Sequence, residues 1–210
     1  MGPFRHTIDD GLEARRSAYE ALYSVLENLF PSIDNVDEFV AKVVKGLEDQ
    51  HEIKILCSLM LTRLAAAAPL ETQNCTHPSD IGLTCVDLEQ MTPKFQGMLV
   101  ISARDKDSVT RQDIEKQHEM RRSCIRTSVA LAQLQSPGVS PAQDIVDIEI
   151  TPHFSKYIRE LRTSQDSQKE FKMFSEELRN TGLGAATLRN LSDISSARAS
   201  SGRGDAMDME

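Results

Sequence analysis

Cys75, His77 and Cys85 have side chains of the types that bind zinc, and they lie near one another in a polar stretch of the chain. Structural zinc sites are tetrahedral and are usually built from tight pairs such as C-x-x-C. The spacing here contains no such pair, and no fourth ligand is obvious. The sequence therefore favours ordinary polar residues over a metal site, and we expect no bound metal.

The other cysteines and histidines form no recognisable pair of nucleophile and base. Cys57 and Cys124 fall on apolar faces of predicted helices, where cysteine behaves as a small buried hydrophobe. His51, His118 and His153 lie near helix starts or on charged faces, where surface and capping roles are commoner than catalysis. No phosphate-binding loop, metal box or triad spacing is present. The sequence argues against an enzyme and against a bound cofactor.

Composition narrows the class of protein. The 210 residues carry a formal net charge of −8, which argues against nucleic-acid binding because that needs clustered lysines and arginines. Hydrophobic residues make up 40% and aromatic residues 5%, a mixture that favours helices. The most apolar run, 53–68, contains Lys54 and Arg63 and is shorter than the roughly 20 residues that span a bilayer. With no secretory signal before the first predicted helix, we expect a cytoplasmic or nuclear protein that contacts no membrane.

The first third of the chain predicts three helices. Asp10 and Glu13 can form a capping box that starts the first helix. Asp34 and Asn35 can cap a second helix, and a third follows directly. Apolar residues recur at helical spacing in the first two helices and cover more of the circumference of the third. This pattern predicts that the third helix lies between neighbours.

The middle of the chain interrupts this pattern. Residues 69–91 contain two prolines and a glycine among polar residues, and they predict a long irregular loop. Thr92 and Pro93 have the residue types of an N-cap and a first helical position. They predict that a short helix starts there.

The last part of the chain predicts three further helices and a tail. A long helix is expected over 107–135, and two amphipathic helices are expected around Phe154 and Phe171. Residues 136–151 are interpreted as a connector, with a short strand near Ile145 as the alternative. Residues 189–210 are rich in Ser, Ala and Gly and end in acidic residues, so they predict a disordered acidic tail.

The order of these elements predicts the fold class. Successive antiparallel helices joined by turns are typical of paired-helix solenoids, in which each pair buries its face against the next. We therefore expect an all-α, HEAT-like solenoid of antiparallel helix pairs over residues 9–188. A compact helical bundle is the structural alternative.

Several strings of residues resemble one known family. The longest opens the chain, at Met1–Glu13. Shorter matches follow in the same order at Asp37–Phe39, Gly46–Leu47, Ile53–Leu56, Met60–Leu61 and Glu115–Ser123. Together they are similar to the C-terminal, TATA-binding-protein-interacting domain of the cullin-associated, neddylation-dissociated proteins.

The resemblance implies a non-catalytic exchange factor built of HEAT repeats. In this family the C-terminal repeats lie against the N-terminal region of an unneddylated cullin, where they compete with the adaptor that carries a substrate receptor. Residues 1–8 correspond to an extended segment or hairpin tip that projects from the solenoid. The resemblance therefore implies partner contacts at Gly2, Pro3, Phe4, Arg5, His6 and Thr7. The alternative for Phe4 is a hydrophobic staple on the first helix.

Two departures from the family pattern bear on this interpretation. The family continues upstream of Met1 with many more repeats, and residues 69–103 match poorly. The sequence is therefore interpreted as the cullin-binding end of a longer solenoid, apparently in a truncated chain. The alternative is a generic HEAT-type scaffold fragment that is inactive without upstream repeats.

Overall fold

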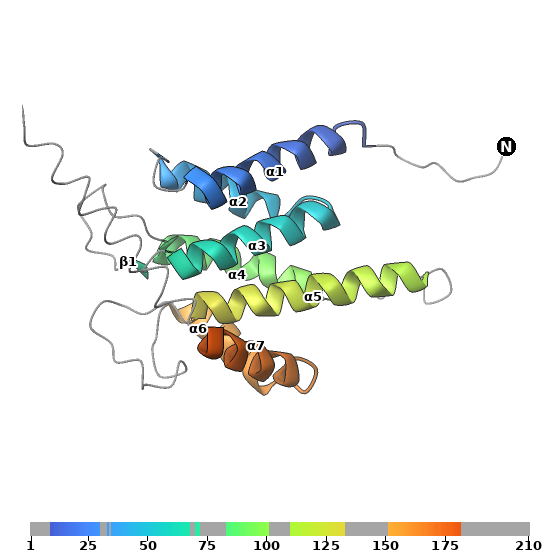
Figure 1. The fold of residues 1–210 in the computed structure, drawn as a ribbon. Helices are drawn as coiled ribbons and strands as arrows, with labels where there is room; N and C mark the ends of the chain where they lie inside the picture. Colours follow the sequence, from blue (N-terminus) through green and yellow to red (C-terminus); the bar gives the residue numbers. More distant parts are fainter. Residues whose placement is uncertain are drawn as a thin grey trace, which may run out of the picture.

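The structure is a computed structural model that describes residues 9–29, 33, 35–67, 70–71, 83–100, 110–132 and 151–181. Within these residues the chain forms seven α-helices and one short pair of strands (Figure 1). The helices are α1 (Leu12–Leu29), α2 (Val36–Gly46), α3 (His51–Ala67), α4 (Cys85–Leu99), α5 (Arg111–Ala132), α6 (Pro152–Thr163) and α7 (Gln168–Thr181), and the strands are β1 (Leu70–Glu71) and β2 (Leu83–Thr84).

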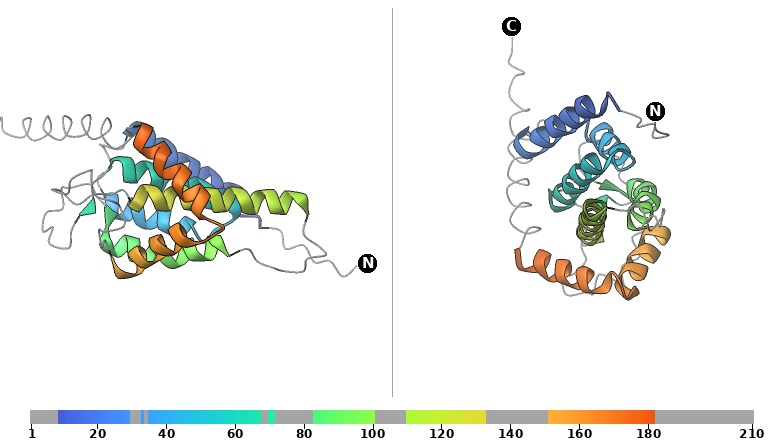
Figure 2. Two further views of the ribbon diagram at one scale, coloured as in Figure 1. Left: turned by 90° about the horizontal axis from the view of Figure 1, so that it is seen from below. Right: turned by 90° about the vertical axis from the view of Figure 1, so that its right-hand side faces the viewer.

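The helices form two rows. In the odd row α1, α3, α5 and α7 pack each on the next, and in the even row α2, α4 and α6 do the same. Across the rows, α3 packs on α2, α5 on α4 and α7 on α6, and Figure 2 shows the two rows end-on. Each consecutive pair from α2 onward is thus one unit of a solenoid. The prediction of an all-α, HEAT-like solenoid is confirmed.

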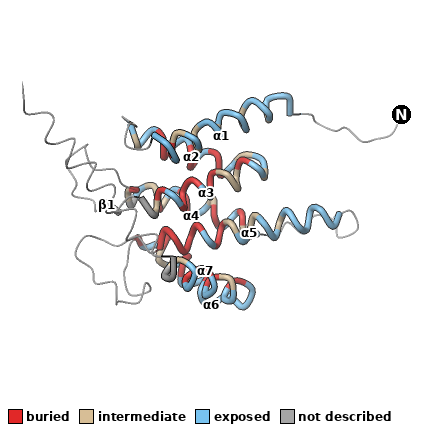
Figure 3. Tube along the Cα trace, in the orientation of Figure 1, coloured by how far each residue is buried: buried red, intermediate tan, exposed pale blue. Residues whose placement is uncertain are grey.

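The hydrophobic core lies between the two rows. Figure 3 shows the buried residues on the inward sides of the helices and in the second half of α5. α3 packs against α1, α2 and α5, which confirms the prediction that it lies between neighbours. Apolar side chains on both sides of α3 are therefore buried away from water. Burial of apolar surface is the main favourable term in folding.

The helix starts differ in how well local sequence predicted them. Asn35 caps α2, as predicted, by accepting a hydrogen bond from the Glu38 N–H at 3.0 Å. The prediction of a capping box at Asp10 and Glu13 is wrong. α1 begins at Leu12, and the side chain that accepts a backbone hydrogen bond at its start is Asp9. Asp9 accepts from the Gly11 N–H at 3.2 Å instead, since its carboxylate is held against the start of α1 by the contacts described below.

The structure corrects the described part of the irregular loop predicted over 69–91, and residues 69 and 72–82 lie outside the described residues. β1 and β2 pair in parallel, and α4 already begins at Cys85. Thr84 and Asp87 form its capping box: the Asp87 N–H donates to Thr84 Oγ1 at 3.2 Å, and the Thr84 N–H donates to Asp87 Oδ2 at 2.9 Å. Thr followed three positions later by Asp is a helix-start signal that the prolines and polar residues before it obscured.

The prediction that a helix starts at Thr92 and Pro93 is also wrong, because both residues lie inside α4. Pro93 is exposed, so its ring does not enter the core. The Thr92 hydroxyl is buried and donates to the Leu88 carbonyl at 2.7 Å. Burial of one continuous apolar face outweighs the cost of an internal proline. That face consists of Leu88, Met91, Phe95 and Met98.

The last two predicted helices are α6 and α7, in which Phe154 and Phe171 are buried, as the sequence indicated. The long predicted helix is α5. The predicted connector before Thr151 and the predicted tail over 189–210 lie outside the described residues. Among the helices that the structure describes, none combines the length and the apolar character needed to cross a membrane.

Candidate partner-binding surface

The predicted contact residues lie outside the described part of the chain. These are Gly2, Pro3, Phe4, Arg5, His6 and Thr7. The structure does describe the point to which they connect, at Asp9 and the start of α1. The contacts that hold this point therefore determine where the predicted segment leaves the solenoid.

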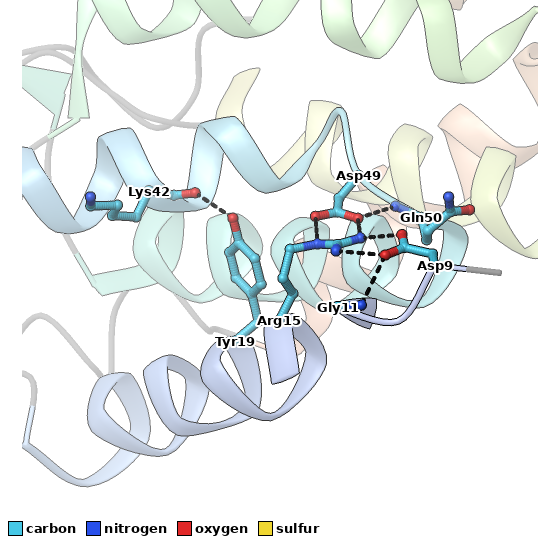
Figure 4. Close-up of polar contacts among 7 residues, drawn as sticks. All are labelled: Asp9, Gly11, Arg15, Tyr19, Lys42, Asp49 and Gln50. Carbon is cyan, nitrogen blue, oxygen red and sulfur yellow. Dashed lines mark hydrogen bonds and ion pairs between the residues drawn. The ribbon is translucent and has the colours of Figure 1, made fainter. Parts of the chain in front are cut away.

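Arg15 joins the start of α1 to the turn between α2 and α3 (Figure 4). Its Nη1 and Nη2 atoms donate to the two carboxylate oxygens of Asp9 at 3.0 and 2.7 Å. Its Nε and Nη2 atoms donate to the carboxylate of Asp49 at 2.8 and 2.9 Å. A planar guanidinium bound by two carboxylates in this way fixes both the distance and the orientation of its partners. Asp49 also accepts from the Gln50 N–H at 2.7 Å.

The same contacts change the acidity of both carboxyl groups. Hydrogen bonds from Arg15 lower the pKa of Asp9 and the pKa of Asp49 below the usual value for aspartate. The two carboxylates in turn raise the pKa of Arg15. Asp49 is the more enclosed acid, with its side chain 18% exposed against 38% for Asp9, so solvent screens its contact less. At neutral pH the three residues carry an excess of one negative charge.

Tyr19 fixes α1 to α2 one turn further along. Its hydroxyl donates to the Lys42 carbonyl at 3.1 Å. Its ring also lies close to Gly46, where an added Cβ would come within 2.8 Å of the ring and closer still to the Cys57 sulfur. Glycine at this position therefore permits the close approach of α1, α2 and α3. This approach brings the start of α1 beside the turn that carries Asp49.

A second exposed feature lies at the same end of the molecule. The first half of α5 extends beyond the neighbouring helices on the side where α1 begins, as Figures 1 and 2 both show. Its residues 111–116 are all exposed, and Ile114 is 45% exposed. His51, the first residue of α3, contacts Glu119 with its Nε2 atom 3.2 Å from the carboxylate. This contact joins the base of the projecting part to the same turn region as Asp49.

The histidines have the surface and helix-start positions that the sequence indicated. His51 and His153 lie at the starts of α3 and α6, and His118 is exposed. The His153 ring Nδ1 lies 2.6 Å from the carboxylate of Glu89 on α4, and the His153 N–H donates to the same carboxylate at 3.2 Å. Each of the two helix-start histidines thus links its helix to a neighbouring helix of the same row.

The described cysteines are buried, as predicted. Burial raises the pKa of the Cys57 thiol and of the Cys124 thiol to about 12. Both thiols are therefore protonated at neutral pH and are poor nucleophiles. Among the residues that the structure describes, no three His, Cys, Asp or Glu side chains gather as metal ligands would. Cys75, His77 and the side chain of Cys85 lie outside them.

Sequence reasoning did not identify the contact between Arg15 and Asp49. The two residues are 34 positions apart, and no local pattern links them. Arg15 lies two positions after the opening string Met1–Glu13 that resembles a known family. The structure adds the reason for an arginine there, which is a bidentate contact to each of two acids.

Comparison with known proteins confirms that resemblance. The family model TIP120, described as TATA-binding protein interacting (TIP20), matches residues 1–178. Cullin-associated NEDD8-dissociated protein 2 of Rattus norvegicus is 33% identical over 148 residues, which cover 70% of this chain and 10% of the relative. Cullin-associated NEDD8-dissociated protein 1 of Drosophila melanogaster is 34% identical over 160 residues, which cover 74% of this chain and 12% of the relative.

A fungal relative matches in the same way. The protein called Cullin-associated NEDD8-dissociated protein 1, C-terminal part, of Emericella nidulans is 34% identical over 119 residues, which cover 57% of this chain and 10% of the relative. The chain thus spans about a tenth of the length of these relatives. The family match includes the predicted contact residues 2–7, the Arg15 contacts and all the helices through α6. On this match, the chain belongs to the TIP120, TATA-binding protein interacting, family.

Proposed function

We propose that this chain is a non-catalytic cullin-binding module that regulates the assembly of cullin–RING ubiquitin ligases in the cytoplasm or nucleus. The observation that carries the proposal is the family match over residues 1–178, shared with relatives whose names call them cullin-associated. The solenoid supports it, because stacked helix pairs present long surfaces that suit protein partners.

The proposed mechanism is competition. Residues 2–7 contact the N-terminal region of the cullin at a site that overlaps the site of the substrate adaptor, so the two bound states exclude each other. Arg15 supports this role because its bonds to Asp9 and Asp49 fix the base from which the segment leaves. A segment that starts from a fixed base loses less conformational freedom on binding than a free peptide does.

The charge of this end of the molecule bears on the partner surface. Asp9, Arg15 and Asp49 carry an excess negative charge, and the chain as a whole has a formal net charge of −8. A basic or apolar partner surface therefore fits better than an acidic one.

The test is a titration of the purified chain with an unneddylated cullin–RING complex, in the presence and absence of its adaptor. We expect saturable binding that excess adaptor abolishes. Phe4→Ala should weaken binding by at least about tenfold, because truncation of a buried aromatic anchor commonly costs more than 1.4 kcal/mol. The matched control is Leu29→Ala, which removes a 55% exposed apolar side chain at the other end of α1 and should leave binding unchanged.

Two results would contradict parts of the proposal. Binding that persists at saturating adaptor would rule out competition while leaving cullin binding in place. No binding by a chain with a helical circular-dichroism spectrum and a cooperative unfolding transition would rule out cullin binding by this chain alone. That second result would favour a scaffold fragment that needs further repeats.

A further inference from the structure

The start of α5 projects from the described structure and is not packed into it. Residues 110–116, called here the α5 arm, are all exposed. The arm lies at the end of the molecule where α1 begins (Figures 1 and 2). The second half of α5, by contrast, supplies the core with Cys124 and Ile125. Burial among the described residues therefore does not explain why the helix begins as early as Arg111.

Local interactions keep the α5 arm helical. The Asp113 N–H donates to Thr110 Oγ1 at 3.2 Å, and the Thr110 N–H donates to Asp113 Oδ2 at 3.1 Å, which makes a capping box. Arg111 Nε lies 3.0 Å from Glu115 Oε1, one turn further along. A helical segment without tertiary packing is marginal in water, so these contacts favour an ordered arm over a frayed one.

The base of the arm is held from two sides. On the α3 side, Glu119 contacts His51 at 3.2 Å. On the α7 side, Arg121 Nη2 donates to Ser167 Oγ at 3.0 Å, and Arg121 Nε lies 3.8 Å from Glu170. The side chain of Arg121 is only 14% exposed. A helix that is capped at its tip and fixed at its base is preformed, so it loses little conformational freedom when it binds a partner.

Ile114 is the one aliphatic side chain of the α5 arm. It is 45% exposed, whereas the nearby Asp113 and Glu115 are already engaged in the capping box and the ion pair. A single exposed apolar residue is ordinary on a protein surface, but this one lies at the centre of a preformed projection. An apolar residue ringed by polar ones is the arrangement found at the centre of many protein interfaces.

The size of the proposed cullin contact requires a further surface at this end of the molecule. Residues 2–7 number only six, whereas a specific interface uses about 20 to 30 residues a side. They connect to Asp9 at the start of α1, at the same end as the α5 arm. α3 lies between α1 and α5, and packed helices are 8–10 Å apart, so the two contacts are about 20 Å apart. A folded domain presents a surface of that width.

We propose that the α5 arm is a second contact for the cullin that residues 2–7 bind, and that Ile114 packs against an apolar patch of its N-terminal region. This inference rests on the proposed function and deepens it, because it assigns a further binding site for the same partner. Two contacts on one rigid solenoid bind more tightly than either alone, since the second forms at high effective concentration.

The test compares two substitutions of the same chemistry at opposite ends of the molecule. Ile114→Glu places a carboxylate on the α5 arm. The matched control, Val86→Glu, replaces a 60% exposed β-branched side chain at the start of α4, directly after the strand pair (Figure 1). Both positions lie among the first four residues of a helix, where an acid suits the helix dipole, so both variants should fold.

Each purified chain is titrated with an unneddylated cullin–RING complex without adaptor. Ile114→Glu should raise the Kd by at least about tenfold, because it buries a carboxylate in an apolar contact, and Val86→Glu should leave the Kd unchanged. Wild-type affinity in Ile114→Glu would overturn the arm contact and leave the proposed function standing. No binding by the folded wild-type chain would overturn both.

Hydrogen exchange of the wild-type chain provides a second readout that needs no variant. The amides of residues 110–116 should exchange more slowly in the cullin complex than in the free chain, because the partner covers them and prevents local opening. The amides at the start of α4 should exchange equally fast in both. Unchanged exchange in the α5 arm on cullin binding would overturn the inference, even if Ile114→Glu weakened binding.

Discussion

Two arginines link distant parts of the chain at the residue scale. Arg15 joins Asp9 and Asp49 near the start of α1. Arg126 on α5 donates with its Nη2 atom to both carboxylate oxygens of Glu177 on α7, at 2.7 and 2.9 Å, and its guanidinium lies 4.9 Å from the centre of the Phe174 ring. Both sets of contacts depend on a planar guanidinium with several N–H donors, so we expect that lysine could not replace either arginine.

We expect Arg15→Met to reduce stability in a pH-dependent way. In the folded protein, hydrogen bonds from Arg15 hold the pKa of Asp9 and of Asp49 below the unfolded value of about 3.9. This stabilisation is complete at pH values well above the unfolded pKa and is lost as the pH falls through the folded pKa values. Urea unfolding at a series of pH values should therefore give free energies for wild type and variant that differ at neutral pH and converge in acid.

Arg16→Met provides the control for this experiment. Among the described residues, the ion-pair partner of Arg16 is Glu20 of its own helix, 3.0 Å away, and both side chains are about half exposed. Such a pair contributes little to stability. A gap between Arg15→Met and wild type that stays constant down to the lowest pH would show that packing of the side chain, and not its ion pairs, stabilises the fold.

α4 shows at the element scale how burial overrides local signals. Its internal proline and its glycine both disfavour helix, yet the helix continues because one face is buried between α2, α5 and α6. Its start is fixed by the capping box of Thr84 and Asp87. α5 begins with a capping box of the same kind, at Thr110 and Asp113, but its first half is exposed.

This difference predicts unequal effects of the same substitution. Thr84→Ala should lower the free energy of unfolding by about 1 kcal/mol, as loss of an N-cap usually does. Thr110→Ala should lower it by less, because the exposed first half of α5 can unfold locally while the core stays intact. Urea unfolding followed by circular dichroism at one pH measures both values. Equal losses would mean that the first half of α5 unfolds together with the core.

The two rows give the whole molecule a gradient of burial. α3 and α5 each have a neighbour on both sides within the odd row, whereas within the described residues α1 and α7 each have one. Hydroxyl groups join α3 and α5 in the buried centre, where Thr127 Oγ1 lies 2.9 Å from the Ser58 carbonyl and 3.0 Å from Thr62 Oγ1. In a solenoid, stability is close to a sum over such neighbouring contacts.

Native-state hydrogen exchange should follow this gradient. We expect the slowest exchange in α3 and in the second half of α5, and faster exchange in α1 and in the first half of α5. The reason is that α1 has only one buried residue, Leu26, while all residues over 124–132 of α5 except Arg126 are buried. Exchange can be measured by mass spectrometry on peptic fragments. Equal protection of α1 and α3 would contradict the predicted gradient.

Local sequence was enough to predict the helices whose apolar periodicity is uninterrupted, because the interactions that specify a helix span only three or four residues. The cap at Asn35, the burial of Cys57 and Cys124 and the all-α class were predictable for that reason. The resemblance of the opening residues likewise identified the family, while the contacts at residues 2–7 stay a prediction.

Long-range packing was needed to continue α4 through Pro93 and to pair Arg15 with Asp49. Each depends on which helices lie side by side, and local sequence does not encode that arrangement. Pro93 is tolerated because the opposite face of its helix is buried, and Asp49 meets Arg15 because α1 packs on α3. Long-range packing supplies the free energy that makes these local exceptions stable.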